Sequence, residues 1–310
     1  MKINKVKGVD ISVLSLGTVQ LGLNYGINNA GGKPSREKAH EVLDAAMTGG
    51  ITALDTAAGY GDSEEVIGSW LAERNDKPFV MTKVSKLDHS SFDALRDGVF
   101  ASVESSKKRL GLKQLPLLML HNCDDYLCDK ENMKRIFAEL KDRGDILFSG
   151  ISAYAHHDYG EIADSGFDAT QIPANVFDWR QIESGGIQRL QDAGMMVFIR
   201  SVYLQGLVFQ TPDKMDPRME FARKTIENFY AICKEFNLSP AVLALSYALS
   251  LPGATSLVLG SETPEQVTQN VELLDQTVTL TPEQMALLQK TFRDTEDRIL
   301  NPGLWFNAYK

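Results

Sequence analysis

Residues 51–73 read ITALDTAAGYGDSEEVIGSWLAE, and they join a short strand to a helix. The strand is predicted at Ile51–Asp55, where mostly apolar residues indicate burial on both faces. The helix is predicted at Glu64–Glu73, after a turn that contains Gly59 and Gly61. A strand followed by a helix is the repeating unit of folds with a parallel sheet, so the number of such units decides the fold.

The same alternation continues along the whole chain. Strands are predicted at Val13–Gly17, Ile51–Asp55, Phe79–Lys83, Leu117–His121, Leu147–Ser152, Ala169–Pro173, Met195–Arg200 and Ser256–Gly260. The clearest helices are predicted at Ser35–Thr48, Glu64–Glu73, Ala94–Leu110, Asn132–Arg143, Glu220–Phe236 and Pro264–Leu274. This count is typical of a closed (β/α)8 TIM barrel of the α/β class. A doubly wound sheet is disfavoured, because it usually has fewer strands and its G-x-G-x-x-G turn is missing here.

The two ends of the chain lie outside this repeat. Residues Ile3–Lys7 and Val9–Val13 flank Gly8, which predicts an N-terminal hairpin at the floor of the barrel. The aromatic-rich tail, residues 301–310, is expected to fold back near the mouth of the barrel or to form a subunit contact. No linker or repeat interrupts the pattern, so we predict one domain over residues 1–310.

Two connections are longer than a compact barrel requires. They follow the first and seventh predicted strands, at residues 20–33 and 203–218. Long loops on the catalytic face of a barrel usually shape a pocket or form a lid, and we expect the same here.

Composition narrows the classes of protein. The chain has 310 residues, 43% of them hydrophobic, and a formal net charge of -9, which argues against a nucleic-acid partner. No apolar run is long enough to cross a bilayer, and the first residues do not resemble a secretory signal. Three cysteines suggest a reducing compartment rather than a disulfide framework. We therefore expect a cytoplasmic protein without a membrane partner. A homo-oligomer is possible.

Four polar residues stand at or just after the ends of predicted strands: Asp55, Tyr60, Lys83 and His121. Residues at the carboxyl ends of barrel strands converge on one mouth. A phenol has a pKa of about 10, and a nearby ammonium lowers it. Asp55 would keep Lys83 charged, while His121 could donate to the same substrate oxygen. Such a set can polarise a carbonyl and protonate the alkoxide that forms when hydride arrives.

Each of the four residues also has a simpler interpretation. Asp55 could cap a loop, Tyr60 could fill a turn, and His121 could be a satisfied core histidine. Lys83 is harder to explain in this way, because a lysine that ends an apolar strand is seldom buried without a partner. Together, on separate strand ends, the four residues indicate chemistry.

Several stretches share a characteristic order and spacing: Leu16-Gly17-Thr18, Leu54–Ala57 with Tyr60–Glu64, Thr82-Lys83, Leu120-His121, Gly150–Ser152, Gln171 with Asn175, and Gly260-Ser261 through Asn270. In these stretches the chain resembles the aldo-keto reductases, over nearly its whole length. The resemblance implies a (β/α)8 barrel and reversible hydride transfer between a nicotinamide cofactor and a carbonyl or alcohol. It implies that Tyr60 is the acid/base, Lys83 lowers its pKa, Asp55 is the counter-ion and His121 orients the substrate.

The resemblance also implies a cofactor site. Ser152 and Gln171 would hold the nicotinamide carboxamide. Two positions depart from the family pattern: Ala153 follows Ser152 where relatives often have asparagine, and Arg200 stands where many relatives have an aromatic residue that stacks on the nicotinamide. A guanidinium can also stack on a ring, or Arg200 could instead form a salt bridge to an acidic loop. The full set of expected cofactor residues is Gly17, Thr18, Ser152, Gln171, Arg200, Ser201, Gly260, Ser261, Glu262, Gln266 and Asn270.

Cofactor choice depends on a second departure. Gly260, Glu262 and Gln266 occupy positions where relatives commonly have the lysine or arginine that binds the extra phosphate of NADP. A carboxylate repels a phosphate but can accept a hydrogen bond from a ribose hydroxyl. We therefore expect NAD(H) or NADP(H) as cofactor, with NAD slightly favoured.

The expected substrate is a small aldehyde, ketone or sugar-like alcohol. Asn24 and Tyr25, with Asn28, Asn29 and Arg200, offer hydrogen bonds suited to a polyhydroxylated molecule. Two alternatives stay open: a barrel lyase that uses a lysine as Schiff-base nucleophile, and a barrel that binds cofactor only as a sensing subunit. In the first, the nucleophile would be Lys83.

A metal site is not expected. The spacing of His121, Cys123 and Cys128, and the run His156-His157-Asp158, match no common zinc pattern. The two cysteines are instead expected to pack in the loop after the fourth strand. Glu64 and its neighbours are expected to begin a helix with acidic residues suited to its dipole.

Overall fold

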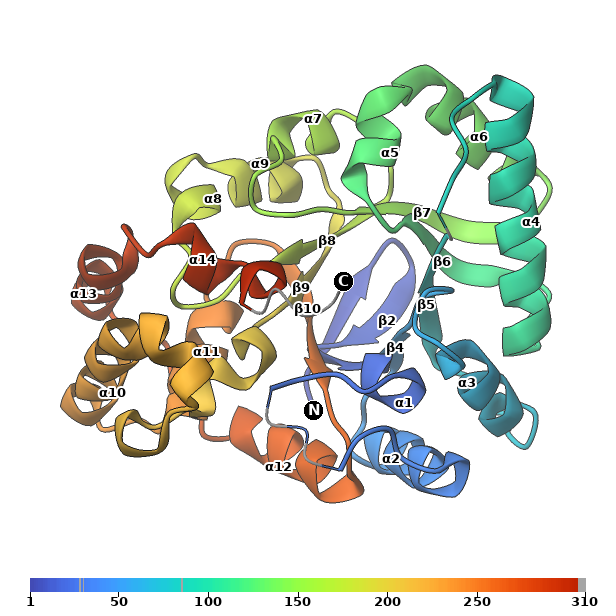
Figure 1. Cartoon of the computed structure of the whole chain (residues 1–310). Helices are drawn as coiled ribbons and strands as arrows, with labels where there is room; N and C mark the ends of the chain where they lie inside the picture. Colours follow the sequence, from blue (N-terminus) through green and yellow to red (C-terminus); the bar gives the residue numbers. More distant parts are fainter. Residues whose placement is uncertain (28, 30, 85, 306–310) are drawn as a thin grey trace.

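The computed structural model describes residues 1–27, 29, 31–84 and 86–305, and it contains a closed parallel barrel. Around the barrel the strands follow the order β10-β3-β4-β5-β6-β7-β8-β9 (Figure 1). Their bounds are β3 (Leu14–Gly17), β4 (Ala53–Asp55), β5 (Phe79–Lys83), β6 (Leu115–Leu120), β7 (Ile146–Ser152), β8 (Ala169–Pro173), β9 (Met196–Arg200) and β10 (Ala254–Gly260). The predicted α/β barrel is confirmed.

Predicted and observed strands differ mainly at their ends. β5 and β8 have the predicted bounds, whereas β6 begins two residues earlier than predicted, at Leu115. The backbone N–H of Leu115 donates to the carbonyl of Asp145 (2.9 Å), which extends the pairing with β7. A single sequence does not reveal such a partner.

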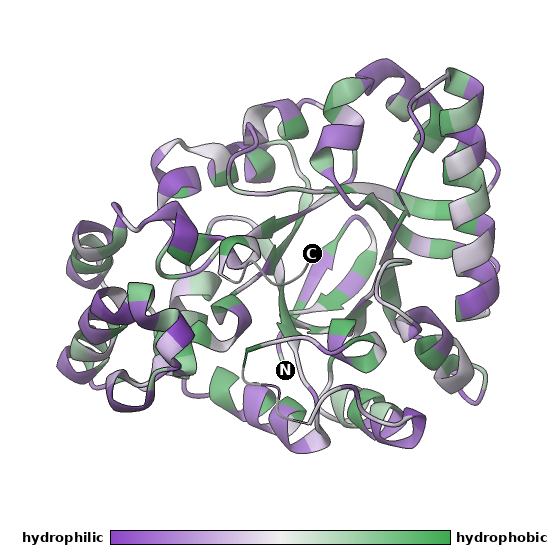
Figure 2. Cartoon of the chain, in the orientation of Figure 1, coloured by the Kyte–Doolittle hydropathy of each residue, from purple (hydrophilic) through white to green (hydrophobic). Residues whose placement is uncertain are grey.

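Helices surround the barrel, and they mix hydrophobic with hydrophilic residues, whereas the strands are mainly hydrophobic (Figure 2). Ser91 caps α4 by accepting from the N–H of Ala94 (3.1 Å), and Gly111 ends it in the left-handed conformation. The helices are α1 (Val19–Gly22), α2 (Arg36–Thr48), α3 (Ser63–Leu71), α4 (Phe92–Leu110), α5 (Cys123–Cys128), α6 (Lys130–Asp142), α7 (Tyr159–Ala163), α8 (Arg180–Glu183), α9 (Gly186–Asp192), α10 (Arg223–Phe236), α11 (Pro240–Leu249), α12 (Pro264–Leu274), α13 (Pro282–Phe292) and α14 (Asp297–Leu300).

Two helix predictions need correction. The predicted helix Glu220–Phe236 is divided into a 3-10 turn, Pro217–Ala222, and α10, because Asp216 and Pro217 open a tight turn before the regular helix. The loop expected around the two cysteines after the fourth barrel strand is instead helix α5, which Asn122 caps by accepting from the N–H of Asp124.

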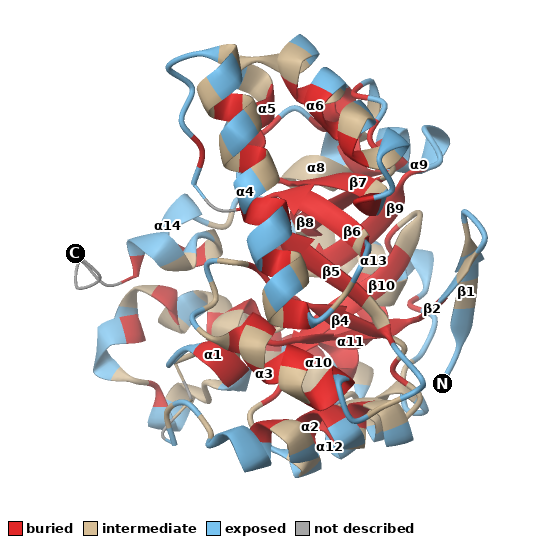
Figure 3. Cartoon of the chain, turned by 90° about the vertical axis from the view of Figure 1, so that its right-hand side faces the viewer, coloured by how far each residue is buried: buried red, intermediate tan, exposed pale blue. Residues whose placement is uncertain are grey.

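The barrel has an inner and an outer core. Buried residues are concentrated in the strands and on the inward sides of the helices, while outward sides are exposed (Figure 3). Strands buried on both faces need apolar residues at consecutive positions, which explains their sequence pattern. The inner core contains Ala53, Met81, Leu117, Met119, Ala169, Met196, Phe198 and Val258.

The predicted hairpin is formed by β1 (Ile3–Val6) and β2 (Val9–Ser12), and it closes the floor of the barrel. Ile11 is fully buried and belongs to the inner core. The Asn4 side chain donates to the carbonyl of Thr255 (2.7 Å), and the N–H of Ser12 donates to the Thr52 hydroxyl (2.8 Å). These contacts leave the opposite end of the barrel as the mouth.

The tail folds back beside the mouth as far as it is described. After α14, the 3-10 turn Pro302–Leu304 leads to Trp305, whose side chain is buried and donates to the carbonyl of Ile299 (3.2 Å). The other aromatic residues of the predicted tail, Phe306 and Tyr309, lie outside the described residues. Within the described ranges, no helix combines the length and apolar character needed to span a bilayer.

Candidate active site

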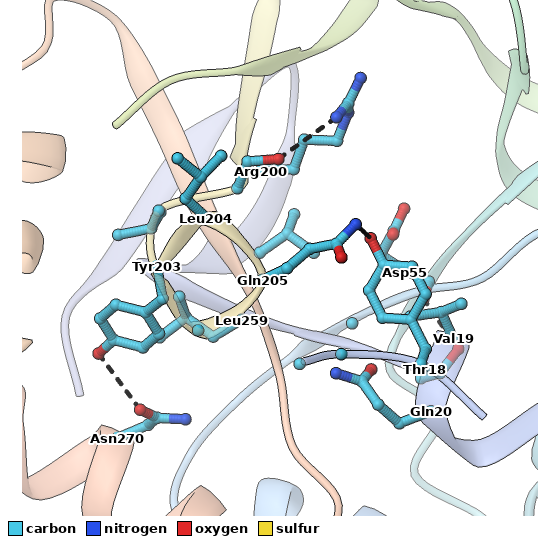
Figure 4. A pocket seen from close by; sticks show the side chains of 18 of the residues that line it. Thr18, Val19, Gln20, Asp55, Arg200, Tyr203, Leu204, Gln205, Leu259 and Asn270 are labelled. Atoms are coloured by element: carbon cyan, nitrogen blue, oxygen red, sulfur yellow. Dashed lines mark hydrogen bonds between the residues drawn. The ribbon is translucent and has the colours of Figure 1, made fainter. Parts of the chain in front are cut away.

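A cavity of about 700 Å³ lies at the mouth, where the carboxyl ends of the strands meet the two long loops. Figure 4 shows labelled side chains from several of these elements around it. Its lining includes most of the predicted site residues: Gly17, Thr18, Tyr25, Asp55, Tyr60, His121, Ser152, Gln171, Arg200, Ser201, Gly260, Glu262, Gln266 and Asn270.

The four predicted catalytic residues are neighbours. Lys83 Nζ donates to Asp55 Oδ1 (2.6 Å) and to the carbonyl of Thr56 (3.0 Å). It also lies 5.0 Å from the centre of the Tyr60 ring, and that ring meets the His121 ring edge-on, with 5.7 Å between centroids. Lys83 is only 1% exposed, so it sits behind the cavity wall while Tyr60 and His121 face the cavity.

Burial controls the protonation of Tyr60 and His121. Burial raises the pKa of Tyr60 above its ordinary value, while attraction to Lys83 acts in the opposite direction. The expected lowering by Lys83 is therefore present, but burial outweighs it. Burial, with repulsion from Lys83, lowers the pKa of His121 to about 4. At neutral pH the site thus holds a protonated phenol and an uncharged imidazole, which are both hydrogen-bond donors.

Lys83 remains an ammonium. Burial lowers its pKa, but attraction to Asp55 and Tyr60, with hydrogen bonds to both, outweighs burial, and the pKa is raised. A buried cation needs a partner of this kind, because desolvation alone would neutralise it. The pair fixes a positive charge directly behind the phenol.

Two buried acceptors at the cavity have no partner among the described residues. Gln171 donates through Nε2 to Asp55 Oδ1 (2.8 Å), which leaves its Oε1 unpaired, and Gln20 Oε1 is unpaired as well. An unpaired buried oxygen costs about 1–3 kcal/mol, so a ligand that donates hydrogen bonds here would bind favourably. Gln20 was not predicted, although it begins the long first loop.

The β10 side of the cavity carries an acid. Glu262 donates through its backbone N–H to Gln266 Oε1 (2.8 Å), and burial raises the pKa of its carboxyl. Asn270 Nδ2 donates to the Ser261 hydroxyl (3.2 Å), so the buried Ser261 supports the wall but does not line the cavity. A Cβ at Gly260 would lie 2.3 Å from the terminal amide of Gln20, so a larger residue here would displace that flexible side chain from its place in the cavity wall.

Arg200 lies beside the predicted catalytic groups and contacts Tyr154, Ala153 and Ser201. Its guanidinium lies 4.7 Å from the centre of the Tyr154 ring and donates to the carbonyl of Ala153 (3.1 Å) and the Ser201 hydroxyl (3.3 Å). The alternative of a salt bridge to an acidic loop is not found among the described residues. Stacking on a nicotinamide stays a prediction.

The long loops shape the cavity, as expected. The Tyr25 hydroxyl accepts from Gln205 Nε2 (2.9 Å), which links the first loop to the loop after β9. Asn24 is not among the residues that line the cavity, and its Oδ1 accepts from the N–H of Lys33 (2.6 Å) within its own loop. Asn29 likewise donates to the carbonyl of Tyr25 (3.2 Å). Asn28, the remaining predicted residue of this loop, lies outside the described residues.

Comparison with known proteins gives the family. The model of the Aldo/keto reductase family matches residues 13–292. The chain belongs to this family. It is 24% identical to pyridoxal 4-dehydrogenase from Microbacterium luteolum, over 87% of this chain and 92% of that protein. It is 26% identical to D-threo-aldose 1-dehydrogenase from a Pseudomonas species, over 81% of this chain and 88% of that protein.

Among solved structures, an aldo-keto reductase from Bacillus halodurans in its holo form matches with a TM-score of 0.76. The match covers 97% of this chain and 100% of that one, at 21% identity, and it supports the fold. The chain described here, as a member of this family, is therefore an oxidoreductase built on a TIM barrel. The unpaired acceptors on Gln20 and Gln171 fit the family's nicotinamide cofactor, whose carboxamide is a hydrogen-bond donor.

Proposed function

We propose that this protein is an NAD(P)-dependent oxidoreductase that interconverts a carbonyl and an alcohol, with Tyr60 as general acid and base. The observation that carries the proposal is the convergence of Tyr60, Lys83 and His121 at one wall of the cavity. When bound, the cofactor supplies or accepts the hydride. The residues suited to hold it are Gly17, Thr18, Ser152, Gln171, Ser201, Gly260, Glu262, Gln266 and Asn270, with Ser261 behind them.

The protein's own groups move the proton. Tyr60 gives its phenolic proton to the substrate oxygen as charge develops there, and the adjacent Lys83 ammonium stabilises the phenolate that remains. Asp55 holds that ammonium 2.6 Å away and prevents its deprotonation. The neutral His121 donates a second hydrogen bond, which orients the carbonyl. In the oxidative direction the same phenolate takes the proton back.

The substrate class follows from the site and the relatives together. Tyr25, Gln205 and Gln269 give the cavity polar walls, which suit a small aldehyde, ketone or sugar-like alcohol. The two curated relatives described above are named for an aldose and for pyridoxal, both of which carry an aldehyde or its hemiacetal. Among the described residues the cavity lining has one basic side chain, Arg200 at the end of β9, whereas the β10 side carries Glu262. We therefore propose that NAD is used at least as well as NADP.

The alternatives have less support. A Schiff-base lyase needs an unprotonated amine that meets the substrate. Lys83 has a raised pKa and does not line the cavity. A sensing barrel would not need a full set of proton-transfer groups, which this chain retains. The free cysteines Cys123, Cys128 and Cys233 support a reducing, cytoplasmic location. A homo-oligomer stays a prediction.

The test combines binding and turnover. NADH and NADPH are titrated by tryptophan fluorescence, and a panel of aldoses and aldehydes is then assayed with each. Tyr60→Phe should keep the cofactor Kd and lose about 10²–10⁴-fold in kcat, because it removes only the proton donor. Tyr159→Phe is the matched control, since Tyr159 is buried but does not line the cavity. Turnover retained by Tyr60→Phe, or a borohydride-trapped adduct on Lys83, would refute the proposal.

A further inference from the structure

Arg200 is the one arginine or lysine in the cavity lining, within the part of the chain that the structure describes. The acidic side chains there are Asp55, which pairs with Lys83 at 2.6 Å, and Glu262, which is hydrogen-bonded to Gln266. The chain as a whole has a formal charge of -9. Arg200 and Glu262 thus balance in number, but no ion pair joins them among the described residues, and an arginine in this cavity without an acidic partner calls for a chemical reason.

The guanidinium of Arg200 is held in place without being neutralised. The Tyr154 ring supports it from one side, and the Ala153 carbonyl and Ser201 hydroxyl each accept one hydrogen bond. No acid lies within ion-pair distance of it among the described residues. A guanidinium has five N–H donors, so donors remain for a ligand. Because these contacts already hold the guanidinium in one position, a ligand that binds to it pays less for ordering the side chain.

A nearby arginine shows the contrast. Arg180 lines the small cavity of about 140 Å³ that adjoins the mouth, and Arg200 lines that cavity too. Arg180 is neutralised by Asp178 at 2.6 Å and by Asp297 at 2.5 Å. The same region of the molecule thus provides two carboxylates for one arginine and none for the other. Arg200 alone keeps its charge available.

The charge also lies within reach of the reacting groups. Its attraction lowers the pKa of Tyr60, and its repulsion lowers that of His121, in each case as a lesser effect than burial. Figure 4 shows Arg200 and Asn270 on separate sides of the cavity. Two exposed aromatic side chains, Tyr154 (46% exposed) and Phe209 (44% exposed), line the same cavity, so this part of its wall reaches the solvent.

We propose that Arg200 binds an anionic group of the substrate, a carboxylate or a phosphate monoester carried on the same molecule as the reacting carbonyl. A guanidinium matches both anions with paired N–H donors. The inference rests on the proposed function, because it places the carbonyl at Tyr60 and His121. It differs from the stacking on nicotinamide that the position of Arg200 in the sequence suggests, and the two uses respond differently to substitution.

The first experiment measures kcat/KM for matched aldehydes that differ in charge: butanal against succinic semialdehyde, and glyceraldehyde against glyceraldehyde 3-phosphate. The wild type should prefer the anionic member of at least one pair by about ten- to a hundredfold, as expected for a charged hydrogen bond. The pair that shows the preference distinguishes carboxylate from phosphate. Arg200→Gln should abolish most of the preference, and Arg200→Lys should keep part of it. Arg180→Gln, the matched control, should keep all of it.

The second experiment does not depend on turnover. Calorimetry compares succinate with 1,4-butanediol, and glycerol 3-phosphate with glycerol, in the wild type and in Arg200→Gln. Only the wild type should bind an anion more tightly than its neutral counterpart. Equal kcat/KM within both pairs, or an anion preference that survives Arg200→Gln, overturns the inference. So does an equal loss on charged and neutral aldehydes together with weaker cofactor binding, which indicates stacking. If no aldehyde reacts, the proposed function fails, and the calorimetry still decides the anion site.

Discussion

Gln171 and Asp55, which are 116 residues apart, share a buried hydrogen bond of 2.8 Å from Nε2 to Oδ1. The same carboxylate oxygen accepts from Lys83 at 2.6 Å. One oxygen atom therefore joins the ends of β4 and β5 to the middle of β8. It fixes the ammonium behind Tyr60, and it turns the unpaired Oε1 of Gln171 into a preorganised acceptor.

This arrangement predicts that Asp55→Asn is costly for both stability and activity. The substitution leaves the Lys83 charge buried without a counter-ion, and breaking such a pair typically costs about 3–5 kcal/mol. Urea denaturation should show this loss in the free energy of unfolding, while kcat falls because the phenolate loses its stabilising cation. Asp10→Asn is the control, since the Lys5–Asp10 pair is exposed and should contribute little. If the two variants lost equal amounts of unfolding free energy and of kcat, the buried pair would contribute no more than the exposed pair.

A second prediction concerns the pH dependence of stability. The pKa of His121 is about 4 in the folded chain and 6.5 in its ordinary range. Between these values the unfolded chain binds a proton here that the folded chain does not. The free energy of unfolding should therefore be unaffected by His121 above pH 6.5, fall as pH decreases towards 4, and level off below it.

His121→Asn should remove up to about 3 kcal/mol of this dependence, at 1.36 kcal/mol per pH unit. Denaturation curves of both proteins at pH 8 supply the baseline, because His121 is neutral there in both states. Identical slopes between pH 4 and 6.5 would contradict the burial of a neutral imidazole. The activity profile should also lack an acid limb near pH 6.5 from this residue.

The closeness of Asp55, Tyr60, Lys83 and His121 could be predicted from the sequence because each lies at or just after the end of an apolar strand, and the end of a barrel strand fixes where its side chain lies. The bond between Gln171 and Asp55 depends on the register of strands far apart in the chain. Asn24 is not among the residues that line the cavity, and a loop sequence does not show that its Oδ1 accepts from Lys33 within the same loop. Glu64 fits the acidic first turn of a helix, yet it is only 1% exposed.

The burial of Glu64 leads to a third prediction. Its carboxylate accepts from the Thr82 hydroxyl and from Arg109 Nε (2.6 Å), and Thr82 directly precedes Lys83. Glu64→Gln keeps the shape of the side chain but exchanges hydrogen bonds to a carboxylate for hydrogen bonds to a neutral amide. It should therefore destabilise the protein by about 1–3 kcal/mol. Glu65→Gln is the control: the Glu65 side chain is 42% exposed and lies 3.8 Å from the same arginine, so its substitution should have a smaller effect. The comparison requires only thermal or urea unfolding, and equal midpoints would exclude this support of β5.

The fourth prediction tests cofactor choice. Glu262→Lys replaces a carboxylate in the cavity lining with the type of cation that binds a phosphate, so kcat/KM for NADPH relative to NADH should rise about tenfold or more. Glu265→Lys makes the same charge change at an exposed position outside the lining, and it should shift the ratio far less. A wild type with a large preference for NADP, or equal shifts in the two variants, would rule out discrimination by Glu262.

The fifth prediction concerns the bridge between Tyr25 and Gln205. The hydroxyl of Tyr25 accepts from Gln205 Nε2 at 2.9 Å, and the N–H of Ile27 donates to the Gln205 carbonyl at 3.4 Å. Both side chains line the cavity, so the bridge joins the two long loops at its wall. Gln205 also has a φ of +52°, a conformation that costs a residue other than glycine free energy. A bridge formed at this cost should slow the release of cofactor.

Two variants separate the side-chain link from the backbone. Tyr25→Phe removes the acceptor alone, and Gln205→Gly removes the donor while relieving the positive φ. Each should raise the dissociation rate of NADH about two- to tenfold in stopped-flow fluorescence, as expected for one hydrogen bond of about 0.5–1.5 kcal/mol. Tyr230→Phe is the control, because its hydroxyl donates to the carbonyl of Val208 in the same loop but does not cross the cavity. If Gln205→Gly releases cofactor faster and Tyr25→Phe does not, the backbone conformation rather than the bridge controls release.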